Sequence, residues 1–547
     1  MQTAQQSAFD RNDSHPALWR VNAATLVGAM LVAGVIAALV RQDASWDLKN
    51  YHFYNGWALV HGRAGIDIAP AQMQTYLNPL LDIPFYAMVA ADWPPRLIAF
   101  ANGMIAGAGA YFLIKTLRIL FGDLARVERR NYMVFAAVLG LLAADPVALL
   151  ASPMNEWQGA TLTMFALWWI LRRLELPAIG ASTLMIAGLA AGAATGAKLT
   201  AAPFAIGLCV ALFARAPIMR RGLPDAFLFG VAVLAGMAIT AGWWFAALYE
   251  HFGNPVFPHY NAWFRSPWWD ARPAIDAHYG PQSAIEWLYF PLLLFRRTAG
   301  LVAASGFRDW RLPVLYVAGL AALVAWFARR NDDTAPAVPG PVAVWRFVAV
   351  FWLVSYAVWL AVYAMYRYII PLELLSGALL LYCLRWLFAG RVLKTAIVAL
   401  TIVLIASTRY PYVERVDYGE RYIRVVVPPV LGGAAILLVA DEPMSHVLPF
   451  FPPDARFLGV KNNLIDPAMT NQLAAEVAHV VAAHDGPLYV LAYPARANES
   501  ALAAHRLRRV VESCADVVSN LTKRPLELCR LERVGVEPKA TAPKAAP

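Results

Sequence analysis

Long apolar stretches recur along this chain with short basic breaks between them, and this pattern constrains its fold more than any other feature. A membrane-spanning helix needs about 20 predominantly apolar residues. Hydrophobic residues make up 60% of the 547 positions and charged residues only 15%, so a soluble fold would expose too much apolar surface. The chain is therefore predicted to be an α-helical polytopic membrane protein. Its formal charge of +10 then reflects which loops face the cytoplasm rather than nucleic-acid binding.

We predict about eleven transmembrane helices, a number that places every clearly basic short loop on the cytoplasmic side. Residues 1–18 are predicted to form a cytoplasmic N-terminus, and the first span is expected to act as a retained signal-anchor. The predicted spans are Trp19–Val40, Pro95–Phe121, Tyr132–Leu150, Gly159–Ile170, Ile179–Ala197, Ala202–Phe213, Phe227–Tyr249, Leu312–Phe327, Phe347–Ala364, Ile369–Leu384 and Ala396–Ala406.

Residues 19–410 thus form a membrane domain with two long external loops, at 42–93 and 250–311. The apolar segment Leu77–Ala91 is short and is interrupted by Pro79, Asp82 and Pro84, so we expect an interfacial helix there rather than a span.

The composition changes after the last span, and residues 411–536 are predicted to form a small periplasmic α/β domain. Strands are expected at 436–443, 487–493 and 526–534, and helices at 469–484 and 499–513. Residues 537–547 are rich in Ala, Pro and Lys and are expected to be a disordered tail. Cys514 and Cys529 both fall in this external domain, which favours a disulfide between them.

The stretch from Trp46 to Tyr54, WDLKNYHFY, follows the first span and is dense in hydrogen-bonding and titratable groups. Chemistry is often carried on such loops of a rigid scaffold. Asp47, Lys49 and His52 are therefore candidate site residues, as is Tyr51. The alternative is an interfacial anchor, because Trp, Tyr and Lys are common at membrane surfaces without any catalysis.

The predicted external side collects further charged and polar side chains. Glu156 lies in the second outer loop, Lys198 at the end of the fifth span and Arg367 at the mouth of the ninth span. The spans themselves hold few ionisable groups, whereas a transporter more often carries charges midway through its helices. The pattern indicates a site at the outer lipid–water boundary.

This arrangement resembles the GT-C superfamily of integral-membrane glycosyltransferases, in particular bacterial members akin to the protein-mannosyltransferase and aminoarabinose-transferase group. The motifs that carry the resemblance are GNPVFP at 253–258, GAKLTAAP at 196–203 and YRYIIPLE at 366–373, together with the acidic residues of the first two outer loops. The resemblance covers about residues 19–410 and does not extend to the C-terminal domain.

The resemblance implies an inverting transfer of a sugar from a polyprenyl-phosphate donor to a periplasmic glycolipid, polysaccharide or protein, at the bacterial inner membrane. Asp47 matches the general base, and Glu156 the second acidic position. Arg367 and Lys198, with Tyr368, would bind the donor phosphate. No cofactor is required by the sequence, although a divalent metal such as Mg²⁺ or Mn²⁺ stays open. Further candidates for substrate binding are Lys49, Tyr51, His52, His259, Asn261 and Arg265.

Each of these assignments has a structural alternative. Arg367 suits an interfacial anchor, Lys198 suits a side chain that snorkels from a helix end, and Glu156 suits a helix cap. Three rival functions also stay open: an O-antigen ligase or polymerase with a polyprenyl-diphosphate donor, a flippase or transporter of lipid-linked sugar, and a membrane scaffold.

Overall fold

The structure is a computed structural model that describes residues 21–176, 178–215, 219–272, 279–329, 341–439, 442–494 and 499–535. The predicted cytoplasmic N-terminus at 1–18 and the predicted tail at 537–547 lie outside these residues. The chain divides into two compact units, each assembled from three separate segments. The first unit comprises residues 1–43, 95–244 and 275–415, and the second comprises 44–94, 245–274 and 416–547.

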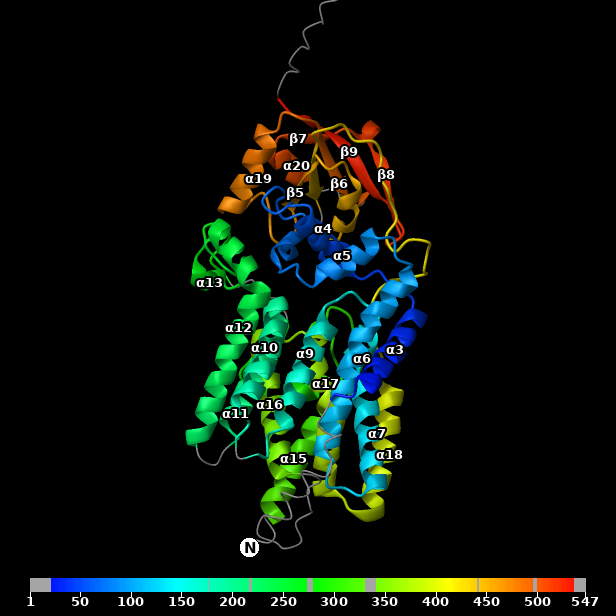
Figure 1. Ribbon diagram of the computed structural model, residues 1–547. Coiled ribbons are helices and arrows are strands. Elements are labelled where there is room, and N and C mark those ends of the chain that lie inside the picture. The colour runs from blue at the N-terminus through cyan, green and yellow to red at the C-terminus, as the bar shows by residue number, and fades with distance from the viewer. Residues whose placement is uncertain are drawn as a thin grey trace, which may run out of the picture. The chain divides into compact units, whose positions relative to one another are not determined.

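The first unit is a bundle of helices that overlap the predicted spans (Figure 1). Among the described residues, six helices are long and apolar enough to cross a membrane; these lie at 95–120, 222–252, 311–329, 342–362, 370–387 and 390–407. Shorter helices accompany them in the bundle. The helices that overlap the predicted spans are α3 (Ala23–Leu39), α6 (Pro95–Leu120), α7 (Arg126–Leu141), α9 (Glu156–Leu171), α10 (Ala181–Ala197), α11 (Ala202–Phe213), α12 (Met219–Phe252), α15 (Arg311–Arg329), α16 (Val342–Val362), α17 (Ile370–Leu387) and α18 (Gly390–Ser407).

Small residues allow these helices to pack closely. A Cβ atom at Gly192 of α10 would lie 2.0 Å from the carbonyl oxygen of Val233 in α12, and one at Gly140 of α7 would lie 2.4 Å from that of Leu374 in α17. Close backbone approach of this kind is a main source of helix association in membranes. Helix α17 lies at the centre of the bundle, because 72% of its most apolar stretch is buried, whereas the corresponding share for α18 is 11%.

The third predicted span, Tyr132–Leu150, is not one continuous helix. Helix α7 ends at Leu141, and a separate short helix, α8 (Ala144–Ala148), follows it. Pro146 explains the break, because proline has no N–H for the helical ladder and its ring clashes with the carbonyl four residues earlier. The turn places Asp145 in the interior, where it is 2% exposed.

The second unit is built on a seven-stranded sheet with the order β3-β8-β9-β6-β4-β5, in which β7 also pairs with β9. Strands β4, β5 and β6 are parallel, whereas β9 is antiparallel to both β6 and β8. The bounds are β3 (Val425–Val426), β4 (Ala435–Val439), β5 (Arg456–Lys461), β6 (Leu488–Ala492), β7 (Leu507–Arg509), β8 (Ala515–Ser519), β9 (Leu526–Arg533), α19 (Gln472–Ala483) and α20 (Glu499–Ala504).

The three predicted strands correspond to β4, β6 and β9, and the helix expected at 469–484 corresponds to α19. The helix expected at 499–513 is wrong beyond Ala504. Arg506 adopts a left-handed backbone with φ of 55°, which ends the helix, and the chain continues as β7 and a 3₁₀ turn at Val511–Ser513.

Segments 44–94 and 245–274 belong to this same unit (Figure 1). They overlap the predicted external loops at 42–93 and 250–311, and we call residues 44–94 the first outer segment. The first contains a π-helix at Leu48–His52, α4 (Phe53–Val60), a 3₁₀ turn at Gln72–Tyr76 and α5 (Asp82–Ala90). Its aromatic side chains share a core with the sheet, and Arg63 donates to the carbonyl oxygens of Pro453 and Ala455 at 3.0 and 2.6 Å. The first outer segment is therefore an ordered layer on the α/β domain.

Candidate functional site

A pocket of about 280 Å³, including its open mouth, lies in the first unit among α9, α10, α11 and α17. Four of its lining side chains carry charge or a phenol: Glu156, Lys198, Arg367 and Tyr368. Glu156 is the first residue of α9, and Lys198 directly follows α10. Arg367 and Tyr368 belong to a 3₁₀ turn, Tyr366–Tyr368, just before α17. Residues that the sequence placed in three different loops thus line one pocket.

The charges of the pocket are arranged around Glu156, whose side chain is 3% exposed. Its Oε1 atom lies 2.7 Å from Nζ of Lys198 and 3.9 Å from Nε of Arg367. Both cations also lie over the ring of Tyr368, at 5.8 and 5.2 Å from its centre, and Arg367 donates to the Tyr368 hydroxyl at 3.2 Å. Two cations against one carboxylate leave the pocket with a net charge of +1.

The turn that carries Arg367 is held by hydrogen bonds from α16 and the residues after it. The indole of Trp359 donates to the carbonyl of Met365 at 2.8 Å, and the hydroxyl of Tyr363 donates to the carbonyl of Leu199 at 2.9 Å. The second bond ties the chain next to Arg367 to the chain next to Lys198. The positions of the two cations are therefore linked by the hydrogen bond from the Tyr363 hydroxyl to the Leu199 carbonyl as well as by Glu156.

Sequence reasoning missed a second group of buried charges in this unit. Asp309 pairs with Arg311 at 2.6 Å, and the backbone N–H of Ala144 donates to Asp309 at 2.9 Å and to Glu373 at 3.1 Å. The charge of Asp145, next along α8, interacts with that of Glu156. A carboxylate inside a predicted span is a signal of function or close pairing, and this signal was present at Asp145.

Asp47 and its neighbours lie in the second unit and are buried. Asp47 is 3% exposed and precedes the π-helix Leu48–His52, a rare conformation that is frequent at functional sites. Nδ1 of His52 lies 2.6 Å from Oδ1 of Asp82, and both side chains are buried. In the sequence, Asp82 is recognisable only as an interruption of an apolar segment. An acidic residue in such a segment indicates a buried partner, which here is His52.

Other side chains of the first outer segment hold that segment in place. The side-chain amide of Asn50 donates to the carbonyl of Ala71 at 3.3 Å and to Gln74 at 3.1 Å. Lys49 is buried, and its carbonyl lies 3.2 Å from Nδ1 of His446. Tyr51 belongs to the aromatic core that this segment shares with the sheet.

The remaining substrate-binding candidates belong to the segment 245–274. The amide of Asn261 donates to the carbonyls of Ser266 and Trp269 at 3.0 and 2.7 Å and accepts from the backbone N–H of Ser266. Asn261 is fully buried and organises this loop. His259 is half-buried, whereas Arg265 is exposed.

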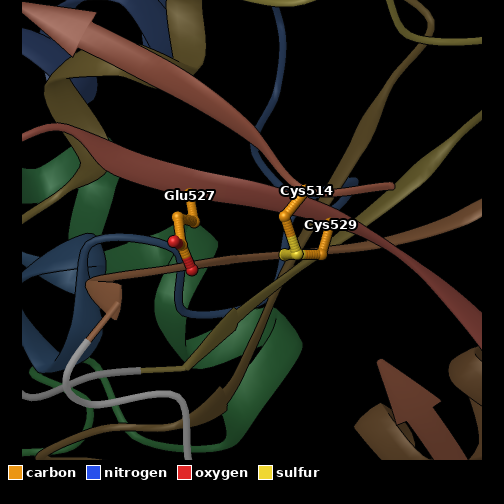
Figure 2. A group of neighbouring side chains, drawn as sticks. All are labelled: Cys514, Glu527 and Cys529. Atoms are coloured by element: carbon orange, nitrogen blue, oxygen red, sulfur yellow. A yellow bond between two sulfur atoms is a disulfide. The ribbon is translucent and has the colours of Figure 1, made fainter. Parts of the chain in front are cut away.

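Metal-binding capacity is small in the described residues. One group of His, Cys, Asp or Glu side chains is compact enough for an ion, namely Cys514, Glu527 and Cys529 (Figure 2). Cys514 and Cys529 form a disulfide there, so neither sulfur is available as a thiolate ligand. In the pocket, Glu156 is the one lining carboxylate, and Lys198 already pairs with it. A divalent ion in this pocket would have to share that single carboxylate with Lys198 and take its other ligands from water or a substrate phosphate.

Comparisons with known proteins add little. No protein-family profile matches the sequence, and no curated protein matches it. A search of solved structures finds similarity to ArnT from Cupriavidus metallidurans, determined with bound undecaprenyl phosphate, at 14% identity and a TM-score of 0.39. The match covers 92% of this chain and 97% of that one. A likeness at this level carries no argument about the fold, the site or the function of this chain.

Proposed function

We propose that this chain is an inverting, GT-C-type glycosyltransferase that uses a polyprenyl-phosphate sugar donor and acts on the periplasmic side of a bacterial inner membrane. The observation that carries the proposal is the convergence of Lys198 and Arg367 on one small pocket of the membrane-helix unit. A phosphate leaving group gains negative charge as its bond to the sugar breaks, and fixed cations stabilise that charge.

The charge of the pocket favours a phosphodiester donor. A sugar-phosphate-polyprenyl diester carries one negative charge, which the net charge of +1 around Glu156 would balance. A diphosphate-linked donor brings two negative charges and would face the carboxylate of Glu156 with one charge uncompensated. For this reason we place the diphosphate-using ligase or polymerase second.

In the proposed reaction, the oxygen of an acceptor hydroxyl attacks the anomeric carbon of the sugar. Its proton passes to a carboxylate, for which we propose Asp47, and the bond between the anomeric carbon and the phosphate oxygen breaks. The released polyprenyl phosphate keeps the bonding electron pair and stays against Lys198 and Arg367. A single displacement of this kind inverts the anomeric centre. The acceptor is a periplasmic glycolipid, polysaccharide or protein.

Ligand binding by the full-length protein in detergent tests the phosphate site. We expect polyprenyl phosphate to bind the wild type and to bind Arg367→Ala and Lys198→Ala at least tenfold more weakly, because each substitution removes one charge-assisted contact. Arg308→Ala is the matched control, since Arg308 also lies over an aromatic ring, that of Trp310 at 5.6 Å, but does not line the pocket.

Three results would speak against the proposal: equal binding by wild type and Arg367→Ala, an equal loss in Arg308→Ala, or tighter binding of polyprenyl diphosphate than of polyprenyl phosphate. A further measurement separates an enzyme from a flippase. An enzyme releases polyprenyl phosphate from the donor as the sugar is transferred to an acceptor, whereas a flippase moves the intact donor across a vesicle membrane.

A further inference from the structure

A second group of cations lies at the other end of α9, away from the pocket. It consists of Lys115 and Arg118 in the last turns of α6, and Arg172 and Arg173 directly after α9, beside Trp168 and Trp169. We call these six residues the α6/α9 basic cluster. Twelve residues separate Glu156 from Trp168 on the same helix, which corresponds to roughly 18 Å along its axis. The cluster is therefore a separate place from the pocket.

The cations of the cluster are close enough to repel one another. The positive charges of Arg118 and Arg172 act on that of Lys115, and the charge of Arg173 acts on that of Arg172. Arg118 and Arg173 are exposed, Arg172 is half-buried and Lys115 is 2% exposed. Within the described residues, neither Asp123 nor Glu175, the acidic residues nearest in the sequence, forms an ion pair with Arg118, Arg172 or Arg173. The cluster thus concentrates positive charge between two helix ends.

The aromatic side chains add hydrogen-bond donors to this charge. The guanidinium of Arg172 lies 3.9 Å from the centre of the Trp169 ring and 5.0 Å from that of Trp168, and Nζ of Lys115 lies 5.7 Å from that of Trp168. Among the described residues, the Nε1 atoms of both tryptophans and Nε of Arg172 are buried without a hydrogen-bond partner. Trp168 is fully buried. Buried donors that lack an acceptor are costly and indicate a missing acceptor.

A simpler reading assigns the cations to the helix ends alone. Positive side chains are stabilised near a helix C-terminus by the negative end of its dipole, by about 0.3–1 kcal/mol each. That effect explains a cation at each terminus. It does not explain three donors without an acceptor at the centre of the group, because the dipole effect requires no buried N–H group.

We propose that the α6/α9 basic cluster binds a phosphate-bearing anion, and that this anion is the headgroup of an anionic phospholipid at the cytoplasmic membrane surface. The basic breaks at 126–130 and 172–173 place this side in the cytoplasm by the positive-inside rule. Basic pockets between membrane helices on that side are a common form of anionic-lipid site. The phosphate oxygens would accept from Arg172 and from the indole N–H groups once the flexible Arg172 side chain moves off the two rings. The exposed side chains of Arg118 and Arg173 would contact the phosphate from the solvent-facing edge of the cluster.

The test uses the full-length protein in a neutral detergent, with cardiolipin, phosphatidylglycerol, zwitterionic phosphatidylethanolamine and inorganic phosphate as separate probes. Bound lipid is counted by native mass spectrometry, and the melting temperature is followed by tryptophan fluorescence. We expect the anionic lipids to bind and raise the melting temperature, and phosphatidylethanolamine to do neither. Arg172→Gln should bind anionic lipid about tenfold more weakly, since it removes one charge-assisted contact, and Arg172→Lys should keep most of the binding.

Arg391→Gln is the matched control, because Arg391 is an exposed cation in the first turn of α18 on the same predicted side. It should bind anionic lipid as the wild type does. Trp168→Phe keeps an aromatic ring but removes the indole N–H, so it tests the site independently if Arg172→Gln fails to fold. Equal weakening in Arg391→Gln, or unchanged binding in both Arg172→Gln and Trp168→Phe, would overturn the proposal. If inorganic phosphate raises the melting temperature and anionic lipids bind no better than phosphatidylethanolamine, the cluster binds free phosphate and the assignment to a lipid headgroup is wrong.

Discussion

Replacement of Glu156 by glutamine should lower the stability of the protein and raise its affinity for an anion at the same time. Glu156 lies 2.7 Å from Lys198 and 3.9 Å from Arg367 in the pocket. Glutamine keeps the size of the side chain and its hydrogen-bonding capacity but removes the negative charge. The net charge of the pocket then changes from +1 to +2.

The expected loss of stability and gain in anion affinity of Glu156→Gln follow from the burial of the ion pair. Removing one partner of a fully buried ion pair costs about 3–5 kcal/mol. Because the Lys198 side chain is 17% exposed and water can reach it, we expect a loss of about 2 kcal/mol. A phosphate bound by the two cations would lie about 6 Å from Glu156, where two unit charges repel by about 2.8 kcal/mol at an effective dielectric of about 20. Since the pocket is open to water, about half of this should be recovered, which corresponds to about tenfold tighter binding.

Thermal unfolding and binding of polyprenyl phosphate by the full-length Glu156→Gln protein measure the two effects. The control is Asp225→Asn, which breaks the partly exposed pair of Arg215 and Asp225, 3.1 Å apart in the same unit. It should lower stability slightly and leave anion binding unchanged. Weaker binding in Glu156→Gln would refute the idea that Glu156 opposes the donor phosphate. A turnover rate reduced by more than a hundredfold, with binding intact, would make Glu156 the base instead.

Three further predictions concern the other unit. Asp47→Asn should lower turnover by about 10²–10⁴-fold, the usual contribution of a general base, while donor binding survives; normal turnover would make the first outer segment a structural layer only. Replacing Cys514 and Cys529 by alanine should destabilise the second unit by about 3 kcal/mol in the chain-entropy model without abolishing transfer, and thiol labelling should find both sulfurs blocked in the wild type until reduction. Burial lowers the pKa of His446 to about 3, so the folded state favours the neutral imidazole. The contribution of His446 to stability is therefore complete above pH 6.5, and it decreases by up to about 1.4 kcal/mol per pH unit as the pH falls toward 3. His446→Gln should flatten that dependence in acid unfolding experiments, and an unchanged slope would show that other groups cause it.

The sequence by itself determined the helical class of the protein and the positions of its long apolar helices. Segments such as 95–121 and 369–384 are predicted correctly because length and hydropathy are local properties that any packing must respect. The strands at 436–443 and 487–493 were predictable for the same reason, since a short apolar run in the middle of a domain needs no knowledge of its partner. The motifs also placed Lys198 and Arg367 among the candidates before their positions in space were known.

Tertiary structure decided which side chains meet. Lys198 is 42 residues from Glu156 in the sequence, and nothing in the local pattern of either residue specifies that their charges lie 2.7 Å apart. Asp82 reads locally as a flaw in an apolar segment, and only the packing of α5 against the π-helix makes it the partner of His52. The sequence predicts the first outer segment to be an external loop, whereas in the structure its aromatic side chains share a core with the sheet, which orders the segment. Periodicity reports which face of an element is apolar, whereas ion pairs and shared cores depend on the close approach of distant segments, which packing alone sets.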